Sequence, residues 1–365
     1  MPNSKTNFKT AEIDTNNITS LDDFYTLTQQ LGSGDKAISN NLYGISSNGV
    51  KGVLPENRDS YGLVFFTRPQ LNLSKKNIMN IRKMYSLLNN DPNSIHRYVR
   101  CMLDPRLETV KVGANTADLD TAGSTLVNNE LAFIPVFTNN IKSMSGWPDV
   151  ALPTFTSKEG LRKEQWTIGD GAIEIYDSFD LDCTFKNMKD EPITMLVETW
   201  VQYIAQVFEG NMSPYIDMIA ENEIDYNTRI YRLVLDETKR YVKKIAATGA
   251  SFPVNVPTGK MFDFTDENKY NTQTKELNLR FKCVGALYND DILIREFNNT
   301  AGIFNPEIRK MANGYVHNLD KIPESLLTVL NHRGIPYINE ETLELEWWID
   351  KNSLSYKRII ASLKK

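Results

Sequence analysis

The segment Ile173–Phe208 reads IEIYDSFDLDCTFKNMKDEPITMLVETWVQYIAQVF, and its hydrophobic period changes at Pro192. From Ile173 to Phe185, apolar side chains occupy every odd position but one, and most even positions are polar. A period of two predicts a strand with one buried and one solvated face. Beyond the proline, apolar residues recur with the spacing of an amphipathic helix. These residues are Ile193, Leu196, Val197, Trp200, Ile204, Val207 and Phe208.

Segments on both sides of this stretch extend the pattern. Alternation returns over 277–287, and a further strand is expected over 224–235. Two long strands with one apolar face each, separated by a helix, predict a mainly antiparallel sheet or barrel with the helix packed on its buried face. A helical hairpin is expected over 74–103, with Ser74 and Ser94 as N-caps. The predicted fold class is therefore α+β.

Chain length and local composition suggest four parts. At 365 residues the chain exceeds the size that one hydrophobic core usually serves. An N-terminal segment rich in Asn, Ser, Thr, Gly and Asp is typical of an extended arm. We expect an arm over 1–55, a mixed segment with the helical hairpin over 56–165, a core of sheet and helix over 166–300, and a C-terminal extension over 301–365.

The overall composition excludes several classes of protein. Charged residues make up 24% of the chain and the formal net charge is -5, which argues against a nucleic-acid binder held by phosphate contacts. No apolar run approaches the ~20 residues that span a bilayer, and the N-terminus has no apolar signal core. The widely spaced Cys101, Cys183 and Cys283 are expected to be small buried hydrophobes, in keeping with synthesis in a reducing cytoplasm.

No catalytic, cofactor-binding or metal-binding signature is found. The three histidines lack the spacing of a helical zinc site, and no phosphate-binding glycine loop or nucleophile elbow is present. Asp180 and Asp182 share the solvated face of one predicted strand and could help to hold a cation, although calcium needs six or more oxygen ligands. The favoured interpretation of this pair is a solvated strand face.

The candidate interface residues lie in a stiff loop and among the tryptophans. The loop over 249–259 contains two prolines and two glycines, so it is expected to be a shaped contact element. Adjacent tryptophans in one strand point to opposite faces, so one of Trp347 and Trp348 is expected to face outward. The predicted interface residues are Phe252, Pro253, Val254, Val256, Pro257, Trp147, Trp347 and Trp348.

Four segments carry a resemblance to a known class. They are LVFFTRPQLNL at 63–73, the segment 87–107 with its Asp104-Pro105-Arg106, ALYNDDI at 286–292, and the segment 343–349. In these blocks the chain resembles virion structural proteins of large contractile-tailed bacteriophages, especially the tail-tube and baseplate-hub type.

The resemblance implies a non-enzymatic subunit of the tail, in the tube, the hub or a junction. Such a subunit assembles into a ring, commonly hexameric, around a lumen that conducts DNA. The implied partners are copies of itself and neighbouring tail proteins, with DNA only as passing cargo and with no membrane, cofactor or small-molecule substrate. The implied location is the virion, after synthesis in the bacterial cytoplasm. The solvated face with Glu174, Asp180 and Asp182 would then face the lumen or a neighbouring subunit.

Two alternatives remain open at this stage. One is a head, neck or portal-proximal connector that binds DNA or other head proteins. The other is a baseplate-associated hydrolase, for which the sequence shows no paired acids and no triad.

Overall fold

The structure is a computed structural model, and it describes residues 61–107, 123–171, 177–259, 262, 275–311, 318–327, 334–351, 353 and 356–357. All of these residues belong to one compact unit, Ser60–Lys365. The predicted N-terminal arm and the predicted strand residues Ile173, Glu174 and Ile175 lie outside the described residues.

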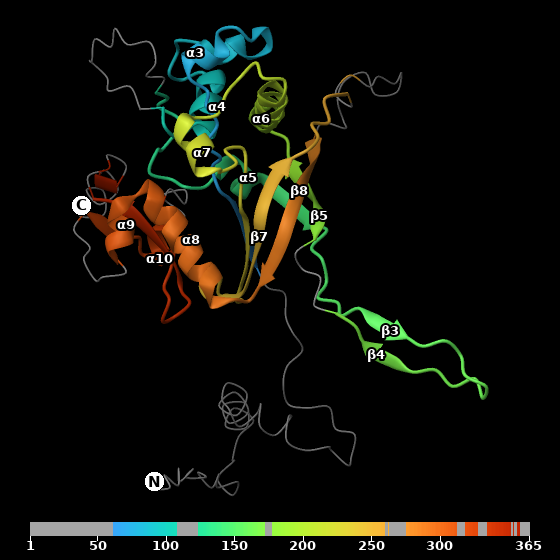
Figure 1. The fold of residues 1–365 in the computed structure, drawn as a ribbon. Helices are drawn as coiled ribbons and strands as arrows, with labels where there is room; N and C mark the ends of the chain where they lie inside the picture. The colour runs from blue at the N-terminus through green and yellow to red at the C-terminus, as the bar shows by residue number, and fades with distance from the viewer. Residues whose placement is uncertain are drawn as a thin grey trace, which may run out of the picture. The chain divides into compact units, whose positions relative to one another are not determined.

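Within the described residues, six strands form one antiparallel sheet that curls into a nearly closed barrel (Figure 1). The longest uninterrupted pairing joins the two strands that the sequence marks as one-faced, from Ser178↔Val284 to Lys186↔Glu276. The predicted antiparallel, barrel-like α+β fold is thereby confirmed. In spatial order the strands are β1 (Gly62–Phe66), β6 (Ile230–Leu235), β7 (Val242–Pro253), β8 (Glu276–Tyr288), β5 (Ser178–Lys186) and β2 (Ile141–Ser145).

The inner face of the barrel forms the first hydrophobic core. Phe66 lies at its centre, with ring centroids 5.0 Å from Phe137 and 5.4 Å from Phe281. The three cysteines are free and buried as predicted, and burial raises the pKa of the Cys283 thiol to about 11. The sheet contributes Val64, Phe66, Leu181, Cys183, Phe185, Ile230, Leu277, Leu279, Phe281 and Cys283 to this core.

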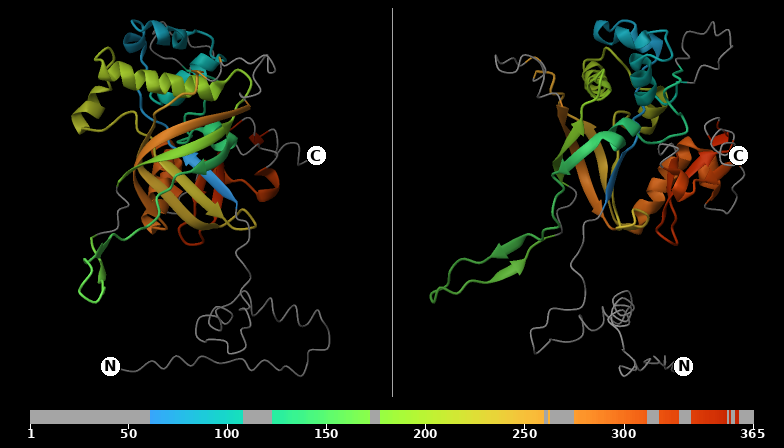
Figure 2. Two further views of the ribbon diagram at one scale, coloured as in Figure 1. Left: turned by 90° about the vertical axis from the view of Figure 1, so that its right-hand side faces the viewer. Right: turned by 180° about the vertical axis from the view of Figure 1, so that it is seen from behind.

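Helix α6 (Pro192–Phe208) lies across one end of the barrel and packs beside α4 (Figure 2). Its buried face matches the predicted stripe from Ile193 to Trp200, and the Trp200 Nε1–H donates to the carbonyl of Tyr226 at 3.0 Å. Two details of the prediction were wrong. Phe208 is 93% exposed at the last turn, and Tyr203, absent from the predicted stripe, is fully buried.

A second core covers the outer face of β1, β6 and β7. Helix α8 (Asp291–Phe304) supplies Phe297, whose ring lies 5.2 Å from Phe65 and stacks on Phe133 at 4.8 Å. These strands are therefore buried on both faces, whereas the outer face of β5 and β8 is open to solvent. Asp290 caps α8, its side chain accepting from the N–H of Ile292.

The C-terminal part packs against this second core. Its described strands form a small sheet in the order β10 (Ile335–Ile338), β11 (Leu345–Asp350), β9 (Leu319–Lys321). The buried Asn298 amide of α8 donates to the carbonyl of Ile338 at 2.7 Å and accepts from its N–H at 2.9 Å, which occupies the edge of β10. Short helices α9 (Pro306–Met311) and α10 (Glu324–Leu327) complete the described part of this region.

The segment predicted as a helical hairpin is only half helical. The second limb is correct: α4 (Ile95–Leu103) begins after Ser94, whose hydroxyl accepts from the N–H of His96. The first limb breaks into a single turn, α3 (Lys75–Ile78), and a 3-10 segment, η2 (Arg82–Leu88). Ser74, one of the two predicted N-caps, makes no side-chain cap, and Tyr85 of η2 is exposed. Since an isolated turn is costly to nucleate, this limb depends on tertiary packing.

Several boundaries differ from the sequence analysis for local reasons. In the predicted mixed segment, Pro135 starts helix α5 (Pro135–Asn140), for which a proline at the first position is favourable. β1 of the predicted mixed segment is a strand of the same sheet as β5–β8. The division of the chain at 55, 165 and 300 remains a prediction. No helix in the described residues is long and apolar enough to cross a membrane.

A buried carboxylate holds the helical end together. Asp104, fully buried at the end of α4, accepts from the N–H of Leu73 at 2.9 Å and from the hydroxyl of Tyr215 at 2.7 Å through the same oxygen. Its other oxygen accepts from the N–H of Arg106 at 3.1 Å. Tyr215 is the residue before α7 (Ile216–Glu221), so one carboxylate links three segments that are distant in sequence. We call these residues the Asp104 cluster.

Arg68 secures the same helix from its other side. The guanidinium is 4% exposed and donates to the carbonyls of Cys101 at 2.7 Å, Met102 at 3.1 Å and Leu131 at 3.2 Å. A cation beside the last carbonyls of a helix also complements the helix dipole. Burial lowers the pKa of the Arg68 guanidinium to about 10, so it remains charged at neutral pH.

The Asp104 carboxyl gives the stability of the fold a testable pH dependence. Burial desolvates the carboxyl and raises its pKa, although hydrogen bonds from Tyr215, Leu73 and Arg106 act in the opposite direction. A raised pKa in the folded state contributes stability that is complete below the unfolded value and is lost as the pH rises through the folded value. The unfolding free energy of Asp104→Asn, relative to wild type, should therefore increase as the pH rises above 3.8 in urea denaturation.

Asp236→Asn is a control of opposite sign. Although desolvation raises the pKa of the Asp236 carboxyl, hydrogen bonds from Thr238 and from the backbone of Tyr241 and Arg240 lower it to about 2. The wild-type contribution of Asp236 is present above 3.8 and is lost as the pH falls toward about 2. The unfolding free energy of Asp236→Asn, relative to wild type, should therefore decrease as the pH rises from about 2 to 3.8. If the unfolding free energies of Asp104→Asn and wild type changed in parallel with pH, the raised pKa of the Asp104 carboxyl would be contradicted.

Candidate assembly surfaces

The open face of β5 and β8 carries a ladder of cross-strand pairs. Asp182 lies opposite Arg280, whose Nε donates to Asp182 Oδ1 at 2.8 Å, and Asp180 lies opposite Lys282 at 3.0 Å. The hydrogen bond to Asp182 raises the pKa of the Arg280 guanidinium. Lys142 of β2 continues the ladder to Glu276, so charges of both signs alternate across three strands.

This ladder decides between the two interpretations of Asp180 and Asp182. Each carboxylate is paired with a cation on the neighbouring strand rather than with further oxygen ligands. In the described part of the chain, no group of three or more His, Cys, Asp or Glu residues could hold a metal ion. The face is a solvated, charge-compensated surface, and opposite charges directly across an antiparallel pair stabilise the pairing.

A two-stranded hairpin projects away from the barrel (Figure 1). Its strands β3 (Thr154–Thr156) and β4 (Thr167–Gly169) pair with Phe155 directly opposite Ile168. Trp166 lies two residues before Ile168 and so shares its face, whereas the Thr156 and Thr167 hydroxyls lie 3.2 Å apart on the other face. The hairpin thus has an apolar face and a threonine face.

The apolar face of the hairpin is uncovered. Phe155 is 54%, Ile168 59% and Trp166 75% exposed. An isolated two-stranded ribbon is at best marginally stable in water, and large exposed apolar patches mark interaction sites. Nothing in the described residues packs on this face, which makes it the strongest candidate for a contact with another molecule.

Two of the five predicted loop residues, Phe252 and Pro253, prove to be part of the sheet. Phe252 and Pro253 end β7; Pro253 is buried opposite Phe281, and the Phe252 ring meets Tyr226 edge-on at 5.6 Å. Val256 packs against the first core and Pro257 is half-buried. Val254 is the one exposed member of this predicted set, and its N–H is bonded to the carbonyl of Arg280. An interface role for these residues remains a prediction.

The predicted tryptophans lie in separate places. Trp147 is half-buried beside Phe179 and Tyr288, at the base of the hairpin. Trp347 and Trp348 lie in β11, and the expectation that one of them faces outward was wrong. Both are half-buried and pack against the second core. The structure does not bring the predicted interface residues together.

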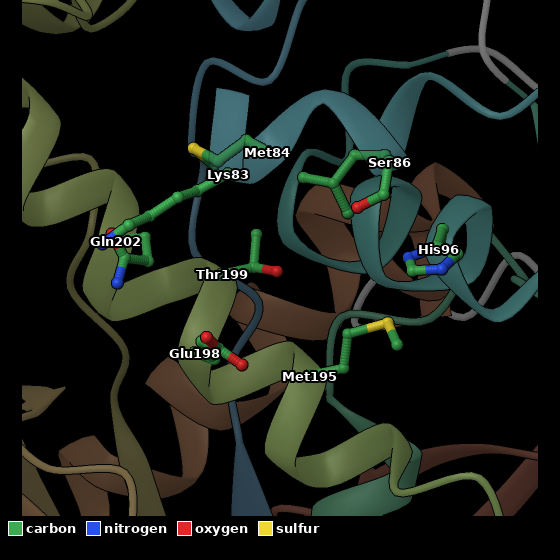
Figure 3. Close-up of a pocket in the computed structure, with 9 residues that line it drawn as sticks. Lys83, Met84, Ser86, His96, Met195, Glu198, Thr199 and Gln202 are labelled. Carbon is green, nitrogen blue, oxygen red and sulfur yellow. The ribbon is translucent and has the colours of Figure 1, made fainter. Parts of the chain in front are cut away.

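A pocket of about 360 Å³ lies between η2, α4 and α6 (Figure 3). It contains Ser86, His96 and Glu198, residue types that could form a catalytic triad. Within the described residues, however, no hydrogen bond joins any two of these three, and the buried His96 Nδ1 has no partner. Figure 3 shows Glu198 and His96 well apart. The pocket supplies no nucleophile with an adjacent base, so it does not support the hydrolase alternative.

The sequence analysis missed the hairpin because its strands are only three residues long. Alternation cannot be recognised in TFT or TIG, and the segment between them is polar. The sequence does contain one indication of an exposed contact segment. A segment rich in Pro, Gly and charged residues carries the apolar residues Val150, Leu152, Phe155, Leu161, Trp166 and Ile168.

A family model described as "Putative phage tail tube protein" matches residues 1–364. Among solved structures, the tube-terminating cap of the anti-feeding prophage is similar at 9% identity and a TM-score of 0.27, covering 43% of this chain and 81% of that chain. The sheath/tube terminator of the extracellular contractile injection system PVC is similar at 10% identity and a TM-score of 0.25, covering 43% and 87%. At these values the two likenesses carry no functional information. Among curated proteins there is no match.

Because the hairpin face is uncovered, substitutions on it are expected to leave the stability of the folded chain nearly unchanged. The double variant Phe155→Thr/Ile168→Thr should change the unfolding free energy by no more than about 1 kcal/mol, because neither side chain packs in a core. Phe66→Ala, the buried control, should lose about 3–5 kcal/mol. Chemical denaturation measures both. A loss in the hairpin variant as large as in the control would mean that this face packs on its own chain.

Proposed function

The chain belongs to the phage tail tube protein family, and from this premise we propose that it assembles with copies of itself into a ring around a lumen that conducts DNA. The chain is a structural protein of the phage tail. The proposed station is the tube, because the matching family is one of tube proteins, and this supports the tail over a head, neck or portal-proximal connector. The proposed partners are further copies and neighbouring tail proteins, and the proposed location is the virion.

The observation that carries this proposal is the apolar face of the β3–β4 hairpin. Phe155, Trp166 and Ile168 are displayed on a ribbon that adds nothing to the cores of its own chain. A contact between this face and a different surface of another copy is heterologous, and heterologous contacts generate rings or open helical stacks. A tube of stacked rings needs one contact within each ring and another between rings, and the hairpin face is the candidate for one of these two contacts.

The ladder on β5 and β8 suits the wall of a lumen. A surface that DNA slides past must not hold phosphates, and Asp180 and Asp182 neutralise Lys282 and Arg280 within hydrogen-bond distance. The face is polar, solvated and free of a large single-sign field. We assign it to the lumen side, with the second core, α8 and the C-terminal sheet on the outer side of the ring.

The proposed role is structural rather than enzymatic. It is supported by family membership and by the pocket of Figure 3, where Ser86, His96 and Glu198 are not hydrogen-bonded to one another. The exposed apolar residues would then serve to hold neighbouring subunits together and would not take part in catalysis.

Assembly of the purified full chain tests the proposal directly. Negative-stain electron microscopy and sedimentation velocity should show rings or tubes of one diameter, with the ring number read from end-on views. Phe155→Thr/Ile168→Thr should remain monomeric at the same concentration, because the contact loses its central apolar side chains. Tyr85→Thr, an exposed aromatic outside the hairpin, is the matched control and should assemble as wild type does. A wild-type chain that stays monomeric while binding DNA would contradict the proposal.

The lumen assignment predicts a gain of DNA retention when the ladder is made basic. Asp180→Lys/Asp182→Lys replaces two negative charges by two positive ones, which raises the net charge of the face by about four units. Assembled particles of this variant should therefore retain DNA that is protected from nuclease and is released by high salt. Wild-type assemblies should hold none. Glu340→Lys/Glu341→Lys makes the same charge change in the turn after β10, and any DNA it binds should be open to nuclease. Protection by this control but not by the ladder variant would place the β5–β8 face outside the lumen.

A further inference from the structure

A second uncovered apolar surface lies between α7 and α8. Ile224, which follows α7, is 52% exposed, and Ile303, in the last turn of α8, is 71% exposed. Both line one pocket of about 250 Å³, together with Met218 and Phe304. Ile216 and Ile219 of α7 are also exposed. We call this surface the isoleucine groove, defined by Met218, Ile219, Ile224, Ile303 and Phe304.

The floor of the isoleucine groove is rigid. Arg68 lies over the Phe304 ring at 5.3 Å and is itself fixed by two carbonyls at the end of α4 and by the carbonyl of Leu131. Arg229, also in the lining, is paired with Glu296 at 2.7 Å and donates to the carbonyl of Thr248. A preformed groove whose floor is fixed by hydrogen bonds loses little conformational entropy when another surface docks on its exposed isoleucines.

Among the described residues, the acidic side chains near this groove include two without a partner, whereas its two arginines are both held by hydrogen bonds. Glu223 lines the groove and Glu221 precedes it at the end of α7. In the described structure neither carboxylate has a hydrogen bond or an ion pair, whereas Asp217 of the same helix is paired with Arg106. The groove lining therefore carries the carboxylate of Glu223, unpaired within the described residues, beside the exposed Ile224, and Glu221 lies two residues before Glu223 in the chain.

The hairpin has the complementary character. Its apolar face ends at a turn with Leu161 fully exposed and with Lys158, Arg162 and Lys163 nearby. None of these three cations is paired with a carboxylate in the described part of the chain. Of the two acidic residues in this turn, Glu164 accepts from the N–H of Arg162, and Glu159 is free. The turn thus carries an excess of one positive charge.

We propose that the isoleucine groove of one copy receives the apolar face of the β3–β4 hairpin of the next copy, with the basic turn beside Glu221 and Glu223. This inference rests on the proposed function and identifies the surface that completes its contact. Apolar surface meets apolar surface, and the free charges on the two sides are opposite in sign. Helices α7 and α8, which flank the groove, and the β3–β4 hairpin lie on different sides of the barrel in Figure 1, so each copy can donate a hairpin to one neighbour and accept a hairpin from another.

Cysteine cross-linking between two variants of the full chain tests the pairing. The donor is Thr156→Cys, on the threonine face of the hairpin, which leaves Phe155, Trp166 and Ile168 intact. The acceptor is Ile303→Cys, and Phe208→Cys at the end of α6 is the control acceptor because it is more exposed but lies outside the groove. The native cysteines are at most 1% exposed, so they contribute little background with a short bismaleimide.

Docking raises the effective concentration of the paired thiols, so donor plus Ile303→Cys should give at least about tenfold more cross-linked dimer than donor plus Phe208→Cys. Particles that assemble but cross-link equally, or only to Phe208→Cys, would overturn the groove assignment and leave the proposed function standing. A chain that stays monomeric and cross-links at neither position would overturn both.

Charge reversal gives an independent arm of the test. Glu221→Lys/Glu223→Lys alone and Lys158→Glu/Arg162→Glu alone should each slow assembly about tenfold at low salt, because each places like charges across the contact. The chain with all four changes should recover the wild-type rate, measured by light scattering. Failure of the combined variant to recover, while each double variant is slowed and remains folded, would place the two charge clusters in different contacts.

Discussion

The antiparallel pairing of β5 with β8 is the constraint on which the rest of the structure depends. It runs without a register shift from Ser178↔Val284 to Lys186↔Glu276, so side chains on both strands alternate in phase. A slip of one residue would exchange Leu181, Cys183 and Phe185 with Asp180, Asp182 and Thr184. The register therefore fixes both the first core on the inner face and the compensated charge ladder on the outer face. From this pair the sheet extends on one side to β2 and on the other through β7 and β6 to β1.

The two ends of this sheet serve different purposes. At β1 and β6 both faces are buried, since α8 and the C-terminal sheet cover the outside, and Arg68 and the Asp104 cluster bind the helical end through buried hydrogen bonds. At β5 and β8 the outer face stays open, and the chain between β2 and β5 leaves the barrel as the β3–β4 hairpin. The exposed apolar residues of the hairpin, and Ile219, Ile224 and Ile303 of the isoleucine groove, lie outside these two cores. Stability and assembly are therefore assigned to different residues of one chain.

Sequence periodicity predicts the parts of this fold whose burial is one-sided and long. It identifies β5, β8 and α6, because each of these elements is at least nine residues long and repeats apolar side chains with the spacing of a strand or a helix. Examples are Leu181 in β5, Phe281 in β8 and Leu196 in α6. It fails where tertiary contacts override local preference. The limb from Ser74 to Leu88 is held by packing rather than helix propensity, and Asp290 is a cap that resembles a turn residue. Periodicity cannot predict the hairpin, since its three-residue strands contain less than two full periods. The prediction that one of Trp347 and Trp348 faces outward was wrong because both side chains are half-buried against the second core.

The central claim is that the apolar face of the hairpin is buried only between copies of the chain. Hydrogen–deuterium exchange of the backbone amides at Thr154–Thr156 and Thr167–Gly169, compared between dilute monomer and assembled particles, measures this most directly. The account predicts fast exchange at these amides in the monomer and strong protection after assembly, while the amides of β8 are protected in both states. Equal and fast exchange of the hairpin amides in both states, with new protection appearing elsewhere, would contradict it.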